Sequence, residues 1–344
     1  MAGLMKHEME PNKLEKHFWI WPIAWYLFLG GLGGGTLFVC GLLDIVFNVE
    51  YLLAPAVFLA LACIAIGTFL LVFELGQPLV FLRVFLSGTA IIKWGACLLV
   101  MALLFGFVYF LFWLPPEWEL FWYGWTWLRD ISAALMALFG VCVVVYTGVL
   151  LCTMKSKPFW NSPALPVLFT VSALSTATAL VALSALFWEQ AWFVEFWFGT
   201  VASSEIFLEV LRHSNEVIVE IMHTADIILV TAEIIVLLLY VFLMRASGNV
   251  TARAVAMEWI SGKKAMLFWV GMMLCGLVIP FGLYMLGGVG ATYVAPILVL
   301  AAGLLLRFLI VYSDKRRAIP GEERFYARMP KGDEQFLKPW KAPY

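Results

Sequence analysis

The chain has 344 residues, of which 63% are hydrophobic and only 13% are charged, and its mean hydropathy is +0.94. A soluble domain carries about twice that charged fraction, so the composition indicates a polytopic membrane protein. The formal net charge of −1 gives no basis for nucleic-acid binding.

Apolar runs long enough to cross a bilayer predict the spanning helices, because about 30 Å of hydrocarbon is crossed at about 1.5 Å per residue. There are eight such runs, near residues 19–47, 51–75, 89–114, 130–153, 163–188, 217–244, 265–286 and 293–313. We therefore expect an all-α integral membrane protein with eight transmembrane helices, in which helices one to four form a bundle beside helices five to eight.

The expected organisation along the chain has three parts. Residues 1–17 form an N-terminal segment, residues 18–313 the eight-helix membrane domain, and residues 314–344 a polar tail. Pro280 and Pro296 lie inside the last two apolar runs and predict kinks there. No cleavable signal peptide is visible, since the first apolar run is long enough to span.

Charge divides the predicted loops into two groups. The loops after helices two, four and six and the start of the tail carry basic residues, namely Arg83, Lys155, Lys157, Arg245, Arg253, Lys263, Lys264, Lys315, Arg316 and Arg317. The opposite loops carry Glu50, Glu117, Glu119, Glu189, Glu195, Glu205 and Glu209. The positive-inside rule then predicts that both termini are cytoplasmic. The acidic, aromatic stretch at 189–216 would lie outside, as an interfacial helix or cap.

Residues that hold redox metals are scarce in the predicted helices. A b-type haem in a helix bundle usually needs two histidines at membrane depth, and of His7, His17, His213 and His223 only His223 lies clearly within a spanning run. The six cysteines include no Cys-x-x-Cys pair, whereas iron–sulfur clusters need grouped thiolates. Glu220 and His223 have a di-iron spacing, but such sites need it twice. We expect no haem, iron–sulfur cluster or metal site in this chain.

The sixth predicted helix carries charged residues at membrane depth, where they are costly and normally face the protein interior or a water path. Five of them fall on two neighbouring stripes, Glu216, Glu220 and His223 on one and Asp226 and Glu233 on the other. Such a row can pass protons. In the simpler interpretation Glu216 and Glu220 sit at the interface, and the others are internal hydrogen-bond partners, with Arg307 of helix eight as a candidate.

Four polar residues on helices one to four lie at one predicted depth. Tyr26 and Lys93 are near the cytoplasmic starts of helices one and three, and Glu74 and Tyr146 are near the cytoplasmic ends of helices two and four. A quinone head group needs such a convergence, because its two oxygens require donors and its two-electron reduction takes up two protons. Glu74 and Lys93 are therefore proton-path candidates as well. The glycine run at 30–35 permits either close helix packing or room for a flat ring.

Three motifs resemble those of a known family. The fourth helix ends in Tyr146-Thr-Gly-Val-Leu-Leu-Cys and is followed by Lys157-Pro-Phe-Trp-Asn-Ser-Pro. The first helix contains Tyr26-Leu-Phe-Leu-Gly-Gly-Leu-Gly-Gly-Gly-Thr, and the second ends in Glu74-Leu-Gly-Gln-Pro-Leu-Val-Phe. Over residues 18–313 the chain resembles the NrfD/PsrC family, the membrane subunits of polysulfide reductase-type respiratory complexes.

The resemblance implies a membrane anchor and quinone-reactive subunit that is not catalytic alone. It implies menaquinone or ubiquinone as cofactor, and the cytoplasmic membrane of a prokaryote as location. Electrons would pass to or from a ferredoxin-like iron–sulfur subunit, joined to a catalytic subunit of the molybdopterin or hydrogenase type. The polysulfide reductase relatives work with catalytic subunits outside the cytoplasm, whereas the charge rule places this pocket toward the cytoplasm; we follow the charge rule.

The resemblance also assigns roles to single residues. In the polysulfide reductase subunit the quinone head lies between a first-helix histidine and the tyrosine that matches Tyr146. Tyr26 stands at the place of that histidine, and a tyrosine is a poor proton acceptor at neutral pH, so proton handling shifts toward Glu74. Trp21 and Trp25 are expected to wall the site.

Trp160 and Asn161 belong to the most specific motif but lie in a loop. We expect them to fix the helical hairpin, with docking of the iron–sulfur subunit as a second role.

A second function stays open at the level of the sequence, that of a secondary transporter or an ion- or proton-translocating module. The charges of helix six, the prolines and the glycines favour it. Against it, no pair of interrupted helices stands at corresponding positions of two halves, the usual sign of a transport site. The two functions are compatible, since quinone chemistry can drive proton movement.

Overall fold

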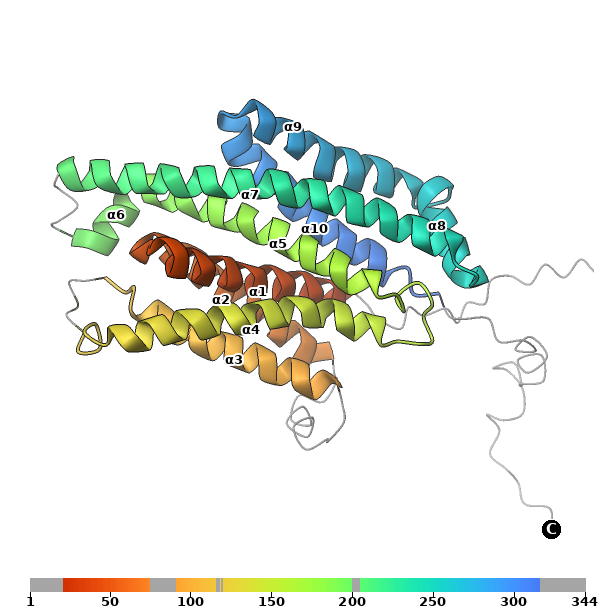
Figure 1. Ribbon diagram of the computed structural model, residues 1–344, viewed down its shortest axis with the longest axis horizontal. Helices are drawn as coiled ribbons and strands as arrows, with labels where there is room; N and C mark the ends of the chain where they lie inside the picture. Colours follow the sequence, from red (N-terminus) through yellow and green to blue (C-terminus); the bar gives the residue numbers. More distant parts are fainter. Residues whose placement is uncertain (1–20, 75–90, 116–117, 119, 200–204, 316–344) are drawn as a thin grey trace, which may run out of the picture.

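The computed structural model describes residues 21–74, 91–115, 118, 120–199 and 205–315, and the secondary-structure elements in these ranges are helices (Figure 1). The spans are α1 (Trp21–Phe47), α2 (Ala54–Glu74), α3 (Ile91–Leu111), α4 (Thr126–Cys152), α5 (Ala164–Ala185), α7 (Glu205–Ala246), the π-helical η6 (Leu267–Val278) with α9 (Ile279–Leu286), and the π-helical η7 (Gly290–Val294) with α10 (Ala295–Val311). Shorter helices are η1 (Glu50–Leu53), η4 (Leu186–Glu189), α6 (Ala191–Phe198) and α8 (Val250–Ser261). Eight of the described helical stretches are long and apolar enough to cross a membrane, which confirms the predicted fold class. The segment 1–17 and nearly all of the tail 314–344 lie outside the described residues.

Helix α1 occupies the centre of the molecule. It packs against α2 and α4 on one side and against α5 and α10 on the other (Figure 1). Of its most apolar stretch 83% is buried, against 33% for α2, so α1 is shielded from lipid by its neighbours. The glycines allow this close packing: a Cβ at Gly34 would meet the backbone oxygen of Gly140 at 2.9 Å, and one at Gly35 that of Ala173 at 2.8 Å.

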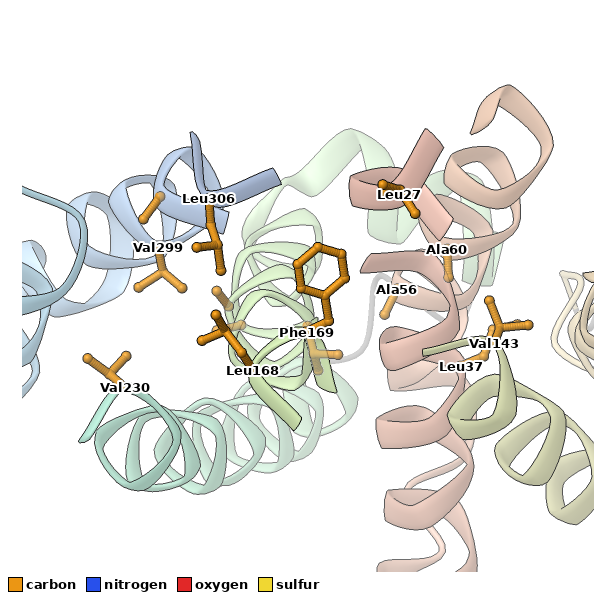
Figure 2. Packing of buried hydrophobic residues seen from close by; sticks show 14 of the residues in the cluster. Leu27, Leu37, Ala56, Ala60, Val143, Leu168, Phe169, Val230, Val299 and Leu306 are labelled. Atoms are coloured by element: carbon orange, nitrogen blue, oxygen red, sulfur yellow. The ribbon is translucent and has the colours of Figure 1, made fainter. Parts of the chain in front are cut away.

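The remaining helices pack on the other side of α5. Helix α7 lies along α5, and α10 contacts α5 and η6. In Figure 2, Leu168 and Phe169 of α5 lie between Leu27 of α1 on one side and Val230 of α7 and Leu306 of α10 on the other. Helix α5 therefore joins the bundle of α1–α4 to the second group of helices.

Helix α7 is much longer than its apolar run. It has 42 residues and begins at Glu205, whereas the apolar run begins at 217. Its first turns carry Glu205, Glu209, Arg212, His213 and Glu216, so the helix continues beyond the apolar region as a charged one. Hydropathy locates only the part of a helix that lipid surrounds. The other half of the predicted interfacial segment forms the short helix α6.

The two prolines of the last spans lie at changes of helix type. Pro280 is in the first turn of α9 and Pro296 in the first turn of α10, each directly after a π-helical stretch. Proline has no backbone N–H and cannot continue the preceding hydrogen-bond ladder. The change from π-helix to α-helix is therefore found next to each proline. The irregularity lies where the prolines predict it, although the sequence did not indicate the π-helical form.

Exposed tryptophans mark both ends of the helix bundle. Trp21 and Trp94 lie at the starts of α1 and α3. Trp118, Trp125, Trp127 and Trp192 lie at the other end, before or at the starts of α4 and α6. Tryptophan is enriched at membrane–water interfaces, so these rings indicate where the bilayer surfaces meet the protein.

Candidate functional site

Two buried tyrosines meet at one end of the α1–α4 bundle. Tyr26 of α1 is 2% exposed and Tyr146 of α4 is 8% exposed, and they lie near enough for their hydroxyl groups to interact electrostatically. Within the described part of the chain, neither hydroxyl makes a hydrogen bond. A tyrosine hydroxyl can donate a hydrogen bond, so this tyrosine pair offers two donors to a bound molecule.

Two glycines lie against the tyrosine rings, and one of them, Gly95, makes room for the Tyr146 ring. A Cβ at Gly95 of α3 would lie 1.9 to 2.2 Å from ring atoms and the hydroxyl of Tyr146. The Tyr146 ring therefore rests directly on the α3 backbone. On the other side, a Cβ at Gly30 would lie 3.9 Å from both the Tyr26 ring and the Thr147 methyl group, so Tyr26 lies over its own helix at the contact with α4. The backbones of α1, α3 and α4 hold the pair together.

The other predicted site residues are placed around this pair in different ways. Lys93 is half-buried on α3, two residues before Gly95. Glu74 is the last residue of α2, and its side chain lies outside the described part of the structure. Trp21 is 51% exposed, and the Trp25 ring packs edge-on against Phe28 and Phe308. Trp25 thus faces α10, while Tyr26 faces α4.

The loop between α4 and α5 is clamped to the end of α10. The Trp160 indole N–H donates to the backbone oxygen of Ile310 at 2.8 Å, and Trp160 is fully buried. The Lys157 ammonium pairs with the Asp314 carboxylate at 2.9 Å. Asn161 is exposed. These contacts support the structural role predicted for Trp160, and they leave Asn161 on a surface beside the tyrosine end.

A second clamp ties α8 to the same end of α10. Trp259 of α8 is fully buried and donates from its indole N–H to the Ser313 hydroxyl at 2.9 Å. The Lys264 ammonium donates to the Tyr312 backbone oxygen at 2.6 Å and to Ser313 at 3.0 Å. Burial lowers the pKa of Lys264 below its usual value of 10.5, because desolvation disfavours the charged ammonium.

The charged residues of the sixth span separate into exposed and buried groups. Glu216 and Glu220 are exposed and His223 is half-buried, whereas Asp226 and Glu233 are buried against α5. Arg307 of α10 is also buried, and it donates to the Ser172 hydroxyl at 3.1 Å and to the Phe169 backbone oxygen at 3.2 Å. Glu233 lies beside Ser172 and within electrostatic reach of Arg307. Arg307 was predicted to be a hydrogen-bond partner of this helix, and Ser172 of α5 lies between Arg307 and Glu233.

Some residues of these sites were not found by reading the sequence. Gly95 carries no motif, although its place two residues after Lys93 on a predicted helix was visible. The buried hydroxyls of Ser172, Ser175 and Thr178 recur at three-residue spacing on α5, and this periodicity was the available signal for a polar face. Among the described residues, no group of three or more His, Cys, Asp or Glu side chains is arranged to hold a metal ion.

Comparison with known proteins agrees with this architecture. The sequence model of the family described as "Polysulphide reductase, NrfD" matches residues 9–195, which include both tyrosines. Protein NrfD of Escherichia coli is 27% identical over 330 residues, covering 88% of this chain and 96% of that protein. The C component of polysulfide reductase from Wolinella succinogenes is also 27% identical over 330 residues, covering 86% of this chain and 94% of that protein. The chain is a multi-pass membrane protein that belongs to the NrfD (polysulphide reductase) family.

Proposed function

We propose that this protein is the membrane anchor and quinone-reactive subunit of a multisubunit respiratory oxidoreductase. The observation that carries the proposal is the tyrosine pair: the hydroxyls of two buried tyrosines from different helices, close together and without hydrogen-bond partners in the described structure. The membership in the NrfD family supports the role of a membrane subunit in a redox complex.

The residues present fit a quinone head group. Its two oxygens each need a hydrogen-bond donor, and Tyr26 and Tyr146 provide two hydroxyl groups. The ring needs apolar, flat surroundings, and the Tyr26 and Tyr146 rings, which lie against Gly30 and Gly95, are apolar and flat. A ligand site of this kind is mostly apolar with a few convergent polar groups. Menaquinone and ubiquinone both present this head-group chemistry.

A bound quinone would supply the two-electron chemistry, and the chain's own residues would position it and manage protons. Tyr26 and Tyr146 orient the head by donating hydrogen bonds, and the packing of Tyr146 on Gly95 fixes the direction of one donor. Neither hydroxyl is a good proton acceptor at neutral pH. Glu74, at the end of α2, is the proposed proton-exchanging acid. Lys93 of α3 is a second candidate for the proton path, and it lies two residues before Gly95, which contacts Tyr146.

The electron partner would dock at the tyrosine end of the bundle. The relative from Wolinella succinogenes is, by its name, one component of polysulfide reductase. In this chain Lys155, Ser156 and Asn161 are exposed beside the clamped α4–α5 loop. A ferredoxin-like iron–sulfur subunit seated there, with a catalytic subunit of the molybdopterin or hydrogenase type behind it, would bring a cluster close to the tyrosine pair. By the charge rule this end, with both termini, faces the cytoplasm of a prokaryotic cell.

The proposal is tested on the complex purified in mild detergent from its own membranes. Mass spectrometry of the co-purifying proteins should identify a partner rich in Cys-x-x-Cys motifs. Oxidation of a short-chain quinol by that complex should be lost in Tyr146→Phe, which keeps the ring and removes one donor. Tyr293→Phe is the matched control, because Tyr293 is 41% exposed and its hydroxyl contacts Glu189 at the far end.

Two outcomes would overturn the proposal. The protein could purify alone or as a homo-oligomer without iron, or Tyr146→Phe could oxidise quinol as fast as the unsubstituted complex. Unchanged quinol turnover together with impaired ion movement would favour the transporter instead.

A further inference from the structure

A line of polar side chains crosses the second group of helices. Asp226 and Glu233 of α7 are 0% and 2% exposed, and both face α5. Thr178 of α5 donates a hydrogen bond to Asp226 Oδ1, and the Tyr284 hydroxyl of α9 lies beside the same carboxylate. Charged groups at membrane depth normally line a functional path. None of these residues takes part in the quinone chemistry proposed above.

The line continues from Asp226 toward the tyrosine end. Glu233 lies beside the hydroxyls of Ser172 and Ser175, and Ser172 accepts a hydrogen bond from Arg307 at 3.1 Å. The Arg307 guanidinium reaches α1, because a Cβ at Gly31 would lie 3.6 Å from its Nη2 atom. Gly31 follows Gly30, which lies against the Tyr26 ring on another face of α1. The line therefore reaches the turn of α1 that also borders the tyrosine pair.

In the other direction the line reaches a cavity. The His223 ring packs near the Tyr284 ring at a tilt, with ring centroids 5.5 Å apart. Glu220 and Glu216 follow on the same face of α7, at the three- and four-residue spacing that makes helix positions neighbours. Glu216 and Asn215 line a cavity of about 600 Å³ between α6, η4 and the start of α7. Helix α6 and the start of α7, which line this cavity, lie at the end of the bundle opposite the loop that joins α4 to α5 (Figure 1).

Buried polar atoms without hydrogen-bond partners are concentrated along this line. They are Asn215 Oδ1, His223 Nε2, Asp226 Oδ2, Tyr284 Oη, Ser175 Oγ, Glu233 Oε1 and Arg307 Nε. Buried atoms of this kind are usually paired by ordered water, and water between acids and hydroxyls is what a proton path requires.

We propose that α5, α7, α9 and α10 carry protons between the quinone reaction at the tyrosine pair and the cavity on the opposite side of the membrane. A quinol that gives two electrons to the partner subunit releases two protons. Each passes to Glu233 by way of the Ser172 hydroxyl and water, then to Asp226, and leaves past Tyr284 and His223 to the cavity. Every acid returns to its starting state, and quinone reduction runs the path in reverse. Arg307 balances the charge of Glu233 and does not itself titrate.

The observations favour a proton over a metal cation as the transported species. Within the described residues no cluster of acids and histidines is arranged to coordinate a metal cation. Acids, hydroxyls and an imidazole can all exchange protons, and a neutral acid carries no charge into the apolar region.

The test rests on the proposed quinone function and uses the whole complex reconstituted into lipid vesicles. A membrane-impermeant electron acceptor is added outside, so that only complexes whose redox subunits face outward turn over. A pH-sensitive dye trapped inside then reports protons arriving at the cavity end. With quinol in the membrane, the unsubstituted complex should acidify the interior.

Asp226→Asn and Glu233→Gln should lose interior acidification per quinol oxidised, because an amide cannot pass a proton in this way. Asp226→Glu should retain it, which shows that the acid rather than its size is required. Glu209→Gln is the matched control, since Glu209 is exposed on the same helix and does not line the cavity. Co-purification of the partner subunits shows that each variant is folded and assembled.

Two failures are distinguishable. If the unsubstituted complex does not oxidise quinol, the proposed function fails, and this inference fails with it. If quinol is oxidised but the interior is never acidified, or if Asp226→Asn acidifies it as fully as the unsubstituted complex, the proton path is wrong and the quinone site stands.

Discussion

At the scale of single residues, the closest contact of the candidate site is the one between Gly95 and Tyr146. A methyl group added at Gly95 would overlap the Tyr146 ring at 1.9 to 2.2 Å. Overpacking of this kind costs about 1–3 kcal/mol and moves side chains. We expect Gly95→Ala to displace the Tyr146 hydroxyl and to reduce quinol oxidation by the assembled complex strongly.

The measurement is the steady-state rate of quinol oxidation, with the amount of assembled complex determined in parallel. Gly282→Ala serves as control, because a Cβ at Gly282 of α9 meets nothing within 4 Å, and that variant should keep its rate. A Gly95→Ala complex that oxidises quinol at the unsubstituted rate would show that the position of Tyr146 does not matter for turnover.

The sequence predicts the depth of a residue along its helix, but not the neighbouring helix that its side chain faces. Tyr26 and Tyr146 could be placed at one depth because helix length and motif position determine depth. The direction of Trp25 toward Phe308 could not, since it depends on how α1 is rotated against α10. The indirect contact between Arg307 and Glu233 through Ser172 also depends on helix rotation and approach.

At the scale of elements, the end of α10 is held by two clamps, and one of them is sensitive to pH. Burial lowers the pKa of Lys264 below 10.5 in the folded protein, so the folded state binds this proton more weakly than the unfolded state does. Between the lowered value and 10.5 the unfolded state holds more protons, and stability from this group rises with pH. We expect the unfolding temperature of the unsubstituted protein, measured relative to that of Lys264→Met, to increase as the pH is raised through this range.

The comparison is made by thermal unfolding in detergent at a series of alkaline pH values. Lys263→Met is the matched control, because Lys263 is the exposed neighbour, and its curve should run parallel to that of the unsubstituted protein. Parallel curves for Lys264→Met as well would show that the Lys264 ammonium is not desolvated in solution.

The elements themselves were predictable to the extent that lipid dictates them. All eight spans follow from apolar length, because a spanning backbone must satisfy its hydrogen bonds internally. The early start of α7 at Glu205 was hidden, since its first turns are charged and resemble a loop. The π-helical stretches before Pro280 and Pro296 were hidden too, because their hydrogen-bond register is settled by packing against neighbouring helices.

At the scale of the whole molecule, the side of the membrane that each end faces decides which compartment the partner subunits occupy. Ser156 is exposed in the α4–α5 loop at the tyrosine end, and Gly124 is exposed in the α3–α4 loop at the other. We expect a cysteine placed by Ser156→Cys to react with an impermeant thiol reagent only in inverted membrane vesicles. Gly124→Cys should react only in intact cells, and the unsubstituted protein provides the background of the native cysteines. Labelling of Ser156→Cys from outside the cell would reverse the orientation.

The proposed proton path through the two buried acids of α7 would make the molecule responsive to voltage. Asp226 and Glu233 are seven residues apart on one helix. That spacing is about 10 Å along the helix axis, or about one third of the hydrocarbon thickness. Moving one elementary charge through 100 mV is worth about 2.3 kcal/mol, so with an even field a proton passing between the two acids gains or loses about 0.8 kcal/mol. On the proposed path, a potential of that size would shift this single step roughly fourfold, and the flow of electrons from quinol would slow or quicken with the electrical state of the membrane.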